Sequence, residues 1–229
     1  MKRSDLLFVS ALLIFFSPFF ISDAVFDFYT KFNSDHGMIM SFIKFAILAT
    51  LGEVIGLRIK TGKYNAPGFG ILPRAIVWGF LGLTIKLAFV IFSSGTVSFL
   101  GFLGMDDAGA VLKGDFSAGK ILVAFCISVF MNTIYAPVMM TLHKITDTHI
   151  QQTGGTVRGL FSPINFSGIL KNLNWDVQWN FVFKKTIPFF WYPAHTITFL
   201  LPVDFQVLFA AILGIALGLI LALASLRAR

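Results

Sequence analysis

Long apolar runs separated by shorter polar stretches dominate this chain, and their lengths predict its elements. A hydrocarbon layer of about 30 Å is crossed by a helix of about 20 mostly apolar residues. Six runs reach or approach that length: 6–21, 38–57, 71–92, 118–142, 186–201 and 205–226. The pattern therefore predicts an all-α, polytopic transmembrane helix bundle with about six spans.

The polar stretch between the fourth and fifth runs, 143–178, predicts an inner loop that contains one short helix. After a cap at Asn165, apolar residues recur at i, i+3, i+4 and i+7 from Phe166. We expect this amphipathic helix to lie on the membrane surface before the fifth span. Because the stretch is too short to bury a core of its own, we expect residues 1–229 to form a single integral membrane domain.

Composition supports the same class. Of the 229 residues, 56% are hydrophobic and 13% are charged, whereas a soluble domain has roughly 25% charged residues. The mean hydropathy is +0.82. We therefore expect an integral membrane protein, with the lipid bilayer as a partner.

The formal charge of +7 is explained by the loops. With the N-terminus inside, thirteen lysines and arginines fall on the inner side and three on the outer side, and cytoplasmic loops collect such residues. Both termini are therefore predicted to be cytoplasmic, and we expect no nucleic-acid partner. Small size and basic inner loops suit a bacterial cytoplasmic (inner) membrane, with an organelle membrane as the alternative.

The first apolar run has a second interpretation. Lys2 and Arg3 precede it, and Ser22 and Ala24 follow it with the spacing of a signal-peptide cleavage site. We treat the run as a first span, and the alternative is a cleaved signal peptide.

Glycines recur at helical spacing in three of the predicted spans. The pairs are Gly52 and Gly56, Gly79 and Gly82, and Gly214 and Gly218. Small residues at this spacing allow helices to approach closely in lipid. We expect these glycines to pack helices within the bundle or in a homo-oligomer.

Polar groups inside the predicted spans are candidates for function, because such groups are costly in hydrocarbon. At about 1.5 Å of rise per residue, Lys44 and Lys86 lie roughly 20 Å from the inner ends of their spans, and Asn132 and His195 roughly 15 Å. If the spans face one another, these four residues would form a belt that lines a pore or ligand site suited to anions or polar metabolites.

Each of these residues also has a structural interpretation. Lys44 and Lys86 can extend their ammonium groups to the outer interface, and Lys86 can instead pair with Asp106 or Asp107. His195 can serve as a hydrogen-bonded structural residue.

A third charge, Glu53, lies on the opposite face of its helix from Lys44, because nine residues at about 100° each bring the chain half a turn round. Arg58 is near it in the sequence, and Arg74 is near it in predicted depth. We expect an interfacial ion pair there.

Three prolines lie within predicted spans: Pro137, Pro188 and Pro193. Proline lacks the backbone N–H that continues a helix, so we expect helix bends at these positions. The last two flank an aromatic block, below His195, where freed carbonyls could face a cavity.

Enzyme signatures are missing from the chain. It has no H-E-x-x-H, no phosphate-binding glycine-rich loop and no G-x-S-x-G elbow. His143, Asp147 and His149 form one cluster of residues whose side chains can bind metals. They lie in a predicted loop, and no further strong ligand is nearby. We therefore expect no enzyme, no metal site and no cofactor.

Three short stretches are similar to motifs of the Mpv-seventeen and peroxisomal-membrane-protein family. RAIVWGFLG from Arg74 resembles the family's Arg with Gly five residues later, at the inner start of a span. MNTIYAPV resembles its Asp-Gln-x-x-Phe-Ala-Pro segment, with Asn132 for Gln and Met131 for Asp. NWDVQWNF followed by LLPVDFQ resembles its Trp-rich and Val-Pro-x-x-x-Arg segments, with Gln206 for Arg. The resemblance implies a non-enzymatic membrane protein with channel-like passage of small solutes.

Two functions follow from the sequence. The first is a channel-like or transport pathway for ions or small polar metabolites, lined by Lys44, Lys86, Asn132 and His195. The second is a non-transporting scaffold that binds lipid or partner helices, in which both lysines point outward and the glycine pairs face partners.

Overall fold

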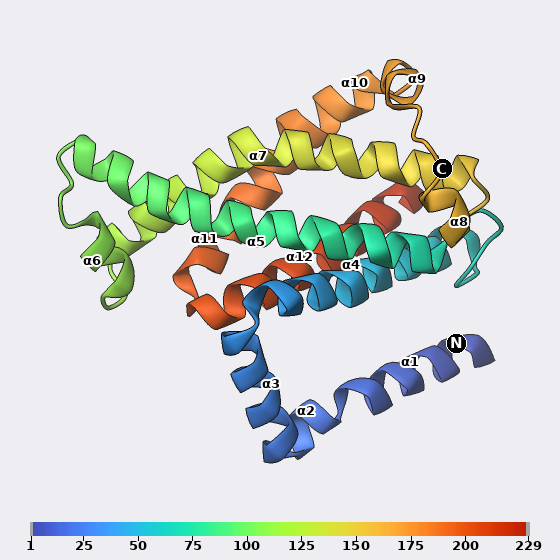
Figure 1. The fold of residues 1–229 in the computed structure, drawn as a ribbon, viewed down its shortest axis with the longest axis horizontal. Coiled ribbons are helices and arrows are strands. Elements are labelled where there is room, and N and C mark those ends of the chain that lie inside the picture. Colours follow the sequence, from blue (N-terminus) through green and yellow to red (C-terminus); the bar gives the residue numbers. More distant parts are fainter. Residues whose placement is uncertain (1, 228–229) are drawn as a thin grey trace. The chain divides into compact units, whose positions relative to one another are not determined.

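The computed structural model describes residues 2–227, and the side chains of residues 2–220. Within this part of the chain every regular element is helical (Figure 1). The elements are α1 (Arg3–Phe16), α2 (Pro18–Ile21), α3 (Asp23–Asp35), α4 (Gly37–Thr61), α5 (Ile71–Phe102), α6 (Ala108–Lys113), α7 (Ala118–Gln152), α8 (Val157–Leu160), α9 (Phe166–Lys171), α10 (Trp175–Val177), η1 (Gln178–Trp191), α11 (Tyr192–Leu200) and α12 (Val203–Arg227). The all-α prediction is confirmed.

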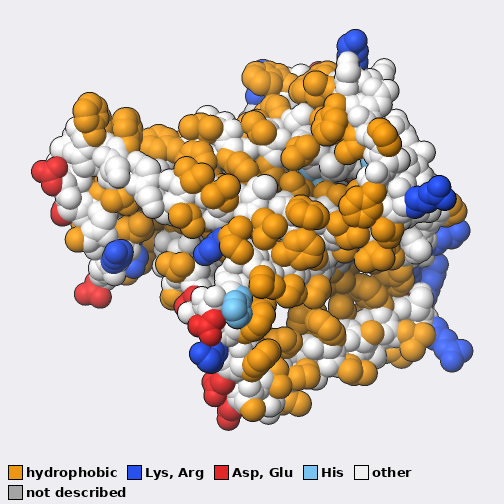
Figure 2. All heavy atoms as spheres, in the orientation of Figure 1, with side chains coloured by type: hydrophobic (Ala, Val, Ile, Leu, Met, Phe, Trp, Pro, Cys, Tyr) orange, Lys and Arg blue, Asp and Glu red, His pale blue; other side chains and the backbone are white. Residues whose placement is uncertain are grey.

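Four of these helices are long and apolar enough to cross a membrane: α4, α5, α7, and α12 over Val203–Ile220. Large apolar side chains such as Val90, Ile134 and Val138 are exposed on them, as expected for surfaces that face lipid. Figure 2 shows hydrophobic side chains covering the middle of the visible face of residues 41–229, with lysine and arginine gathered toward the end where α8 lies. These four helices are consistent with a helical integral membrane protein.

The chain forms two compact units, Met1–Met40 and Ser41–Arg229. In the first unit the predicted span 6–21 is interrupted. Its helix ends at Phe16, Pro18 opens α2, and Ser22 caps α3 by accepting from the Val25 N–H. Proline is favoured at a first helical position because the lost N–H would be unpaired there. The resulting α1, of 14 residues, is not among the four long apolar helices.

The second unit holds the other helices. In it α7 packs against α5 on one side and against η1 and α11 on the other, and α11 contacts α12. The helix α7 continues through residues 143–152, which the sequence pattern had assigned to the inner loop. Likewise α5 runs to Phe102, ten residues beyond the predicted end of its span.

Glycines set the spacing between α4 and α5. A Cβ added at Gly79 would lie 2.5 Å from the Phe42 ring, and one at Gly82 would lie 2.6 Å from the Ser41 carbonyl oxygen. Both separations are too short for van der Waals contact. Only glycine allows this close approach of the two helices.

Glycines also lie between α4 and α12. A Cβ at Gly52 would lie 2.9 Å from Ile215 Cα, whereas one at Gly56 would lie 3.9 Å from the Gly218 carbonyl oxygen. A Cβ at Gly214 would meet nothing within 4 Å. Five of the six predicted packing glycines therefore lie at helix contacts inside the chain, and Gly214 does not.

Residues 175–200 form one uninterrupted helical segment whose middle is a π-helix. The π-helical part, η1, has 14 residues and includes Pro188. Such i→i+5 hydrogen bonding is rare and usually confined to one turn. Pro193 lies in the first turn of α11, and Pro137 lies inside α7. Helices continue past all three prolines, and the predicted bends there stay predictions.

The short helix predicted after Asn165 is α9. The Asn165 side chain accepts from the Gly168 N–H at 3.0 Å and so caps it. The helix ends at Lys171, and Trp175 opens the long segment that follows. The helical segment that contains the predicted fifth span, 186–201, thus begins at Trp175, earlier than the sequence suggests. Its parts η1 and α11 are not among the four long apolar helices.

Candidate functional site

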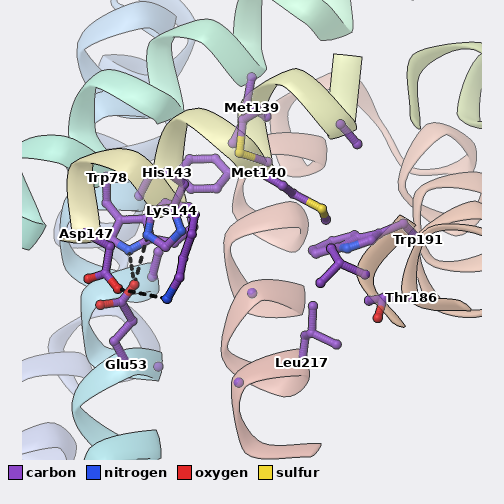
Figure 3. A pocket seen from close by; sticks show the side chains of 18 of the residues that line it. Glu53, Trp78, Met139, Met140, His143, Lys144, Asp147, Thr186, Trp191 and Leu217 are labelled. Carbon is purple, nitrogen blue, oxygen red and sulfur yellow. Dashed lines mark hydrogen bonds and ion pairs between the residues drawn. The ribbon is translucent and has the colours of Figure 1, made fainter. Parts of the chain in front are cut away.

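A cavity of about 640 Å³ lies inside the second unit. Its walls come from α4, α5, α7, η1, α11 and α12 (Figure 3). A volume of this size falls in the range of small-molecule sites, roughly 300–1,000 Å³. Most of its lining is apolar, and its polar groups gather in two places.

The first polar group is a charged cluster centred on Glu53 of α4. The Glu53 carboxylate forms an ion pair with Arg74, accepts from the Trp78 Nε1–H at 2.9 Å, and lies 3.0 Å from Nε2 of His143. The Trp78 and His143 rings also pack together, with centroids 4.3 Å apart. Three helices are joined at this one carboxylate, and Figure 3 shows the Trp78 and His143 side chains close to it.

Arg74 links this carboxylate to a second one. Its guanidinium forms a further ion pair with Asp147 of α7, and its Nε donates to the Phe69 carbonyl at 2.6 Å. It also lies over the Phe69 ring, 4.4 Å from the centroid. The Arg74 side chain is only 6% exposed. Its charge is therefore balanced within the protein by two carboxylates.

Two loops hold this end of the cavity in place. Gly70, just before α5, and Gly155, just after α7, both have left-handed backbones, with φ of 68° and 69°. A Cβ on Gly70 would lie 2.8 Å from Gly155 Cα. Glycine at both positions lets the loops touch, and this contact fixes the start of α5 where Arg74 lies.

The second polar group lies deeper and carries no formal charge pair. His195 of α11 and Asn132 of α7 are joined through Nδ1 and Oδ1 at 3.0 Å. The Asn132 amide donates to the Ser128 carbonyl at 2.8 Å, and the Ser128 hydroxyl donates to the Tyr192 carbonyl at 2.8 Å. This network ties α7 to α11.

The network also fixes the tautomer of His195. Because the Asn132 amide nitrogen donates to a carbonyl, Oδ1 must be the acceptor in its bond with His195. The His195 Nδ1 therefore carries the hydrogen. In the neutral ring Nε2 then holds the lone pair, available as an acceptor.

Aromatic rings surround His195. The Trp191 ring stacks on it with centroids 4.9 Å apart, and the Phe89 ring meets it edge-on at 5.8 Å. Phe199 packs against Phe89 at 5.0 Å. Phe89 and Phe199 are buried and do not line the cavity, so they form a layer behind His195.

The predicted polar belt is divided. Asn132 and His195 line the cavity, whereas Lys44 and Lys86 do not. Lys44 is buried and lies within electrostatic range of Lys86 and Asp204. Counting residues along each span gives the depth of a side chain but not the direction in which that helix face points. Depth alone therefore does not separate Asn132 and His195 from Lys44 and Lys86.

The predicted ion pair of Glu53 and Arg74 is present, as described above. Arg58, the third residue of that prediction, donates to the Gly62 carbonyl at the end of its own helix and lies over the Tyr64 ring at 5.3 Å.

Sequence reasoning missed the parts played by His143, Asp147 and Trp78. His143 and Asp147 had been considered with His149 as metal ligands, but His149 faces the Gly159 carbonyl at 3.0 Å. The signal was the i, i+4 spacing of His143 and Asp147, which places both on one face of a helix that continues past residue 142. Trp191 belongs to the aromatic block between Pro188 and Pro193, and the sequence pattern does not predict its place on the cavity wall.

Comparison with known proteins gives no match: no family model, curated protein or solved structure is similar to this chain.

Proposed function

We propose that this integral membrane protein provides a channel-like or transport pathway for small solutes, and that the cavity is its solute chamber. The observation that carries the proposal is the cavity itself. It extends from the charged cluster, near the ends of α4 and α7, to Asn132 and His195 within the bundle. Polar groups at depth that line a cavity are typical of transport sites.

The same proposal includes a topology. The basic ends of the helices would face the cytoplasm of a bacterial inner membrane, with both termini inside. The segments 6–21 and 175–200 would then complete six crossings. The cavity would be entered from the cytoplasmic side, and Phe89 and Phe199 would close it beyond His195. Apolar constrictions of this kind gate pathways by excluding water.

The resemblance to the Mpv-seventeen and peroxisomal-membrane-protein family adds a similar expectation. Its motifs contribute to the cavity, since Arg74 belongs to the first and Asn132 to the second. Tyr135 of the second motif hydrogen bonds with Thr84 of α5 at 2.7 Å. Membership of the family is part of the proposal.

Gly214 provides the test. It lines the cavity, and a Cβ there meets nothing within 4 Å, so Gly214→Leu should fill space without moving the helices. Purified protein in liposomes should speed glycerol entry, measured by light scattering, above the rate of protein-free liposomes. Gly214→Leu should remove most of that increase.

Two variants serve as controls. A Cβ at Gly95 of α5 also meets nothing within 4 Å, but Gly95 is exposed and away from the cavity, so Gly95→Leu should leave the rate unchanged. Lys86→Ala should also have no effect, because Lys86 does not line the cavity. If liposomes that contain the wild-type protein take up glycerol, potassium and chloride no faster than protein-free liposomes do, the proposal is overturned.

The alternative is a non-transporting scaffold that binds lipid or partner helices. The placement of Lys86 away from the cavity favours it, whereas Lys44, although it is also away from the cavity, is buried and does not. Five packing glycines are used within the chain, however, and not held for a partner or for a homo-oligomer. An absence of flux for every solute above would support the scaffold.

A further inference from the structure

The deep end of the cavity places a hydrogen-bond donor next to a hydrogen-bond acceptor. Trp191 is 9% exposed, and its Nε1–H has no partner among the residues that the structure describes. His195 is 8% exposed, and no described residue bonds its Nε2, which holds the lone pair. Both side chains line the cavity, and their rings stack at 4.9 Å.

Buried polar groups of proteins are nearly always hydrogen-bonded, so the unpartnered Trp191 N–H needs an explanation, and the stacked His195 ring offers an acceptor at Nε2. A hydroxyl supplies both missing partners, since it can donate to one atom and accept from another. A carbonyl or an ether oxygen could serve only Trp191. An ammonium group could serve only His195.

The wall around the Trp191 ring is mostly apolar. Trp191 packs with Ala136 and Ile187, and Met140 and Leu217 lie against this cluster. Figure 3 shows the Trp191 ring between Met140 and Leu217. The Trp191 N–H is itself covered, so an oxygen reaches it only when a neighbour moves. Met140 suits this, because its unbranched side chain adapts easily to a new shape.

Charge on the ligand is disfavoured. The Arg74 guanidinium is balanced by Glu53 and Asp147, and Lys60 and Lys144, which also line the cavity, are exposed to solvent. No counter-charge is held beside Trp191 and His195 among the described lining residues. An ion placed there would lose its hydration without compensation.

We infer that the cavity binds an uncharged, hydroxyl-bearing amphiphile, with its hydroxyl between Trp191 and His195 and its apolar part along Met140 and Leu217. This inference rests on the proposed function, because it names the class of solute that the chamber holds. It narrows that class from ions and polar metabolites to neutral alcohols.

The test uses two isomers of equal size. The compound 1-nonanol donates and accepts, whereas 1-methoxyoctane only accepts. Binding to the full-length protein in nanodiscs is measured by calorimetry, with partition into protein-free nanodiscs subtracted. We expect the alcohol to bind about tenfold more tightly, the effect of one buried hydrogen bond.

Spectroscopy locates the binding site in the wild-type protein, with substitutions used to assign the signals and as a control. With ¹⁵N-labelled histidine and tryptophan, 1-nonanol should shift the Nε2 signal of one histidine and the indole signal of one tryptophan. The shifted indole signal should be the one that Trp191→Phe removes. Trp191→Phe keeps an aromatic ring in place and should weaken the binding of both isomers, whereas Trp179→Phe, on an exposed side chain, should not.

Equal affinities for the two isomers, or shifts at other histidines and tryptophans, would overturn the inference. The outcome is separable from the proposed function. Specific binding of 1-nonanol without solute flux would refute transport and leave the site standing. Glycerol flux without preference for the alcohol would refute the site alone.

Discussion

The two polar ends of the cavity differ in how their polar side chains are stabilised inside the protein. The charged cluster holds Arg74 against two carboxylates, and Glu53 there remains 18% exposed. The deeper pair, Asn132 and His195, uses neutral hydrogen bonds and is almost fully buried. The cost of burying a charge explains the contrast: full charges are held near the helix ends, where they meet opposite charges and some water, and deeper positions hold neutral groups.

The largest expected effect comes from breaking the charged end. Arg74→Met leaves Glu53 and Asp147 without their shared cation. Removing one partner of a buried ion pair costs about 3–5 kcal/mol. We expect a loss of that size in the free energy of unfolding, measured in detergent micelles.

Lys144→Met provides the matched control. Lys144 is exposed, and its Nζ lies 3.9 Å from Asp147, so the loss should be about 1 kcal/mol or less. Similar losses for the two variants would mean that the cluster acts as an ordinary surface network.

The next effect comes from the neutral end. Asn132→Leu removes the acceptor of the His195 Nδ1–H and leaves this donor buried and unpaired, which costs about 1–3 kcal/mol. The same measurement checks it. Thr133→Val, which removes an exposed bond to the Tyr192 hydroxyl, is the control and should cost about 1 kcal/mol or less. A smaller loss for Asn132→Leu than for Thr133→Val would show that the deep network does not stabilise the bundle.

A third effect concerns the contact between α4 and α12. Gly52→Ala places a methyl group 2.9 Å from the Ile215 backbone, and overpacking of this kind costs about 1–3 kcal/mol. Gly56→Ala, one turn away with 3.9 Å of space, should cost less than about 0.5 kcal/mol. If both substitutions are equally tolerated, α4 and α12 are free to separate at this contact.

The smallest effect tests one bond of the cluster. Trp78→Phe keeps a ring beside His143 but removes the N–H that donates to Glu53. Because Arg74 and His143 still contact that carboxylate, we expect a loss of about 1.5 kcal/mol, at the lower end for hydrogen bonds to charged groups. A loss as large as that of Arg74→Met would place the organising role on the tryptophan.

Particular residues indicate how far the sequence could lead. The apolar runs identify the helices, and counting the rise along each span brings Asn132 and His195 to one depth, where the two side chains are hydrogen-bonded. The same count puts Lys44 and Lys86 at a common depth. It does not give the direction in which their side chains point. Direction depends on helix rotation, which is set by close contacts such as that between Gly82 and Ser41.

Other features have only a weak signal in the sequence pattern, or none. Residues 143–152 are too polar to be recognised as the end of a spanning helix, so His143 and Asp147 were assigned to a loop. The π-helix of η1 is a matter of hydrogen-bond register, and the residues of a π-helix resemble those of an α-helix. The cavity follows from both of these features, because α7 supplies His143 and η1 supplies Trp191.

The π-helix also bears on how this protein can change in evolution. Each i→i+5 turn holds more residues than an α-helical turn, so losing one residue from η1 (Gln178–Trp191) allows a local return to α-helical bonding. The same deletion in α7 would rotate every later side chain by about 100°. We therefore expect insertions and deletions of single residues to be tolerated in η1 and to be rare in α7, so that chain length can vary along η1 while the neighbouring wall formed by α7 stays constant.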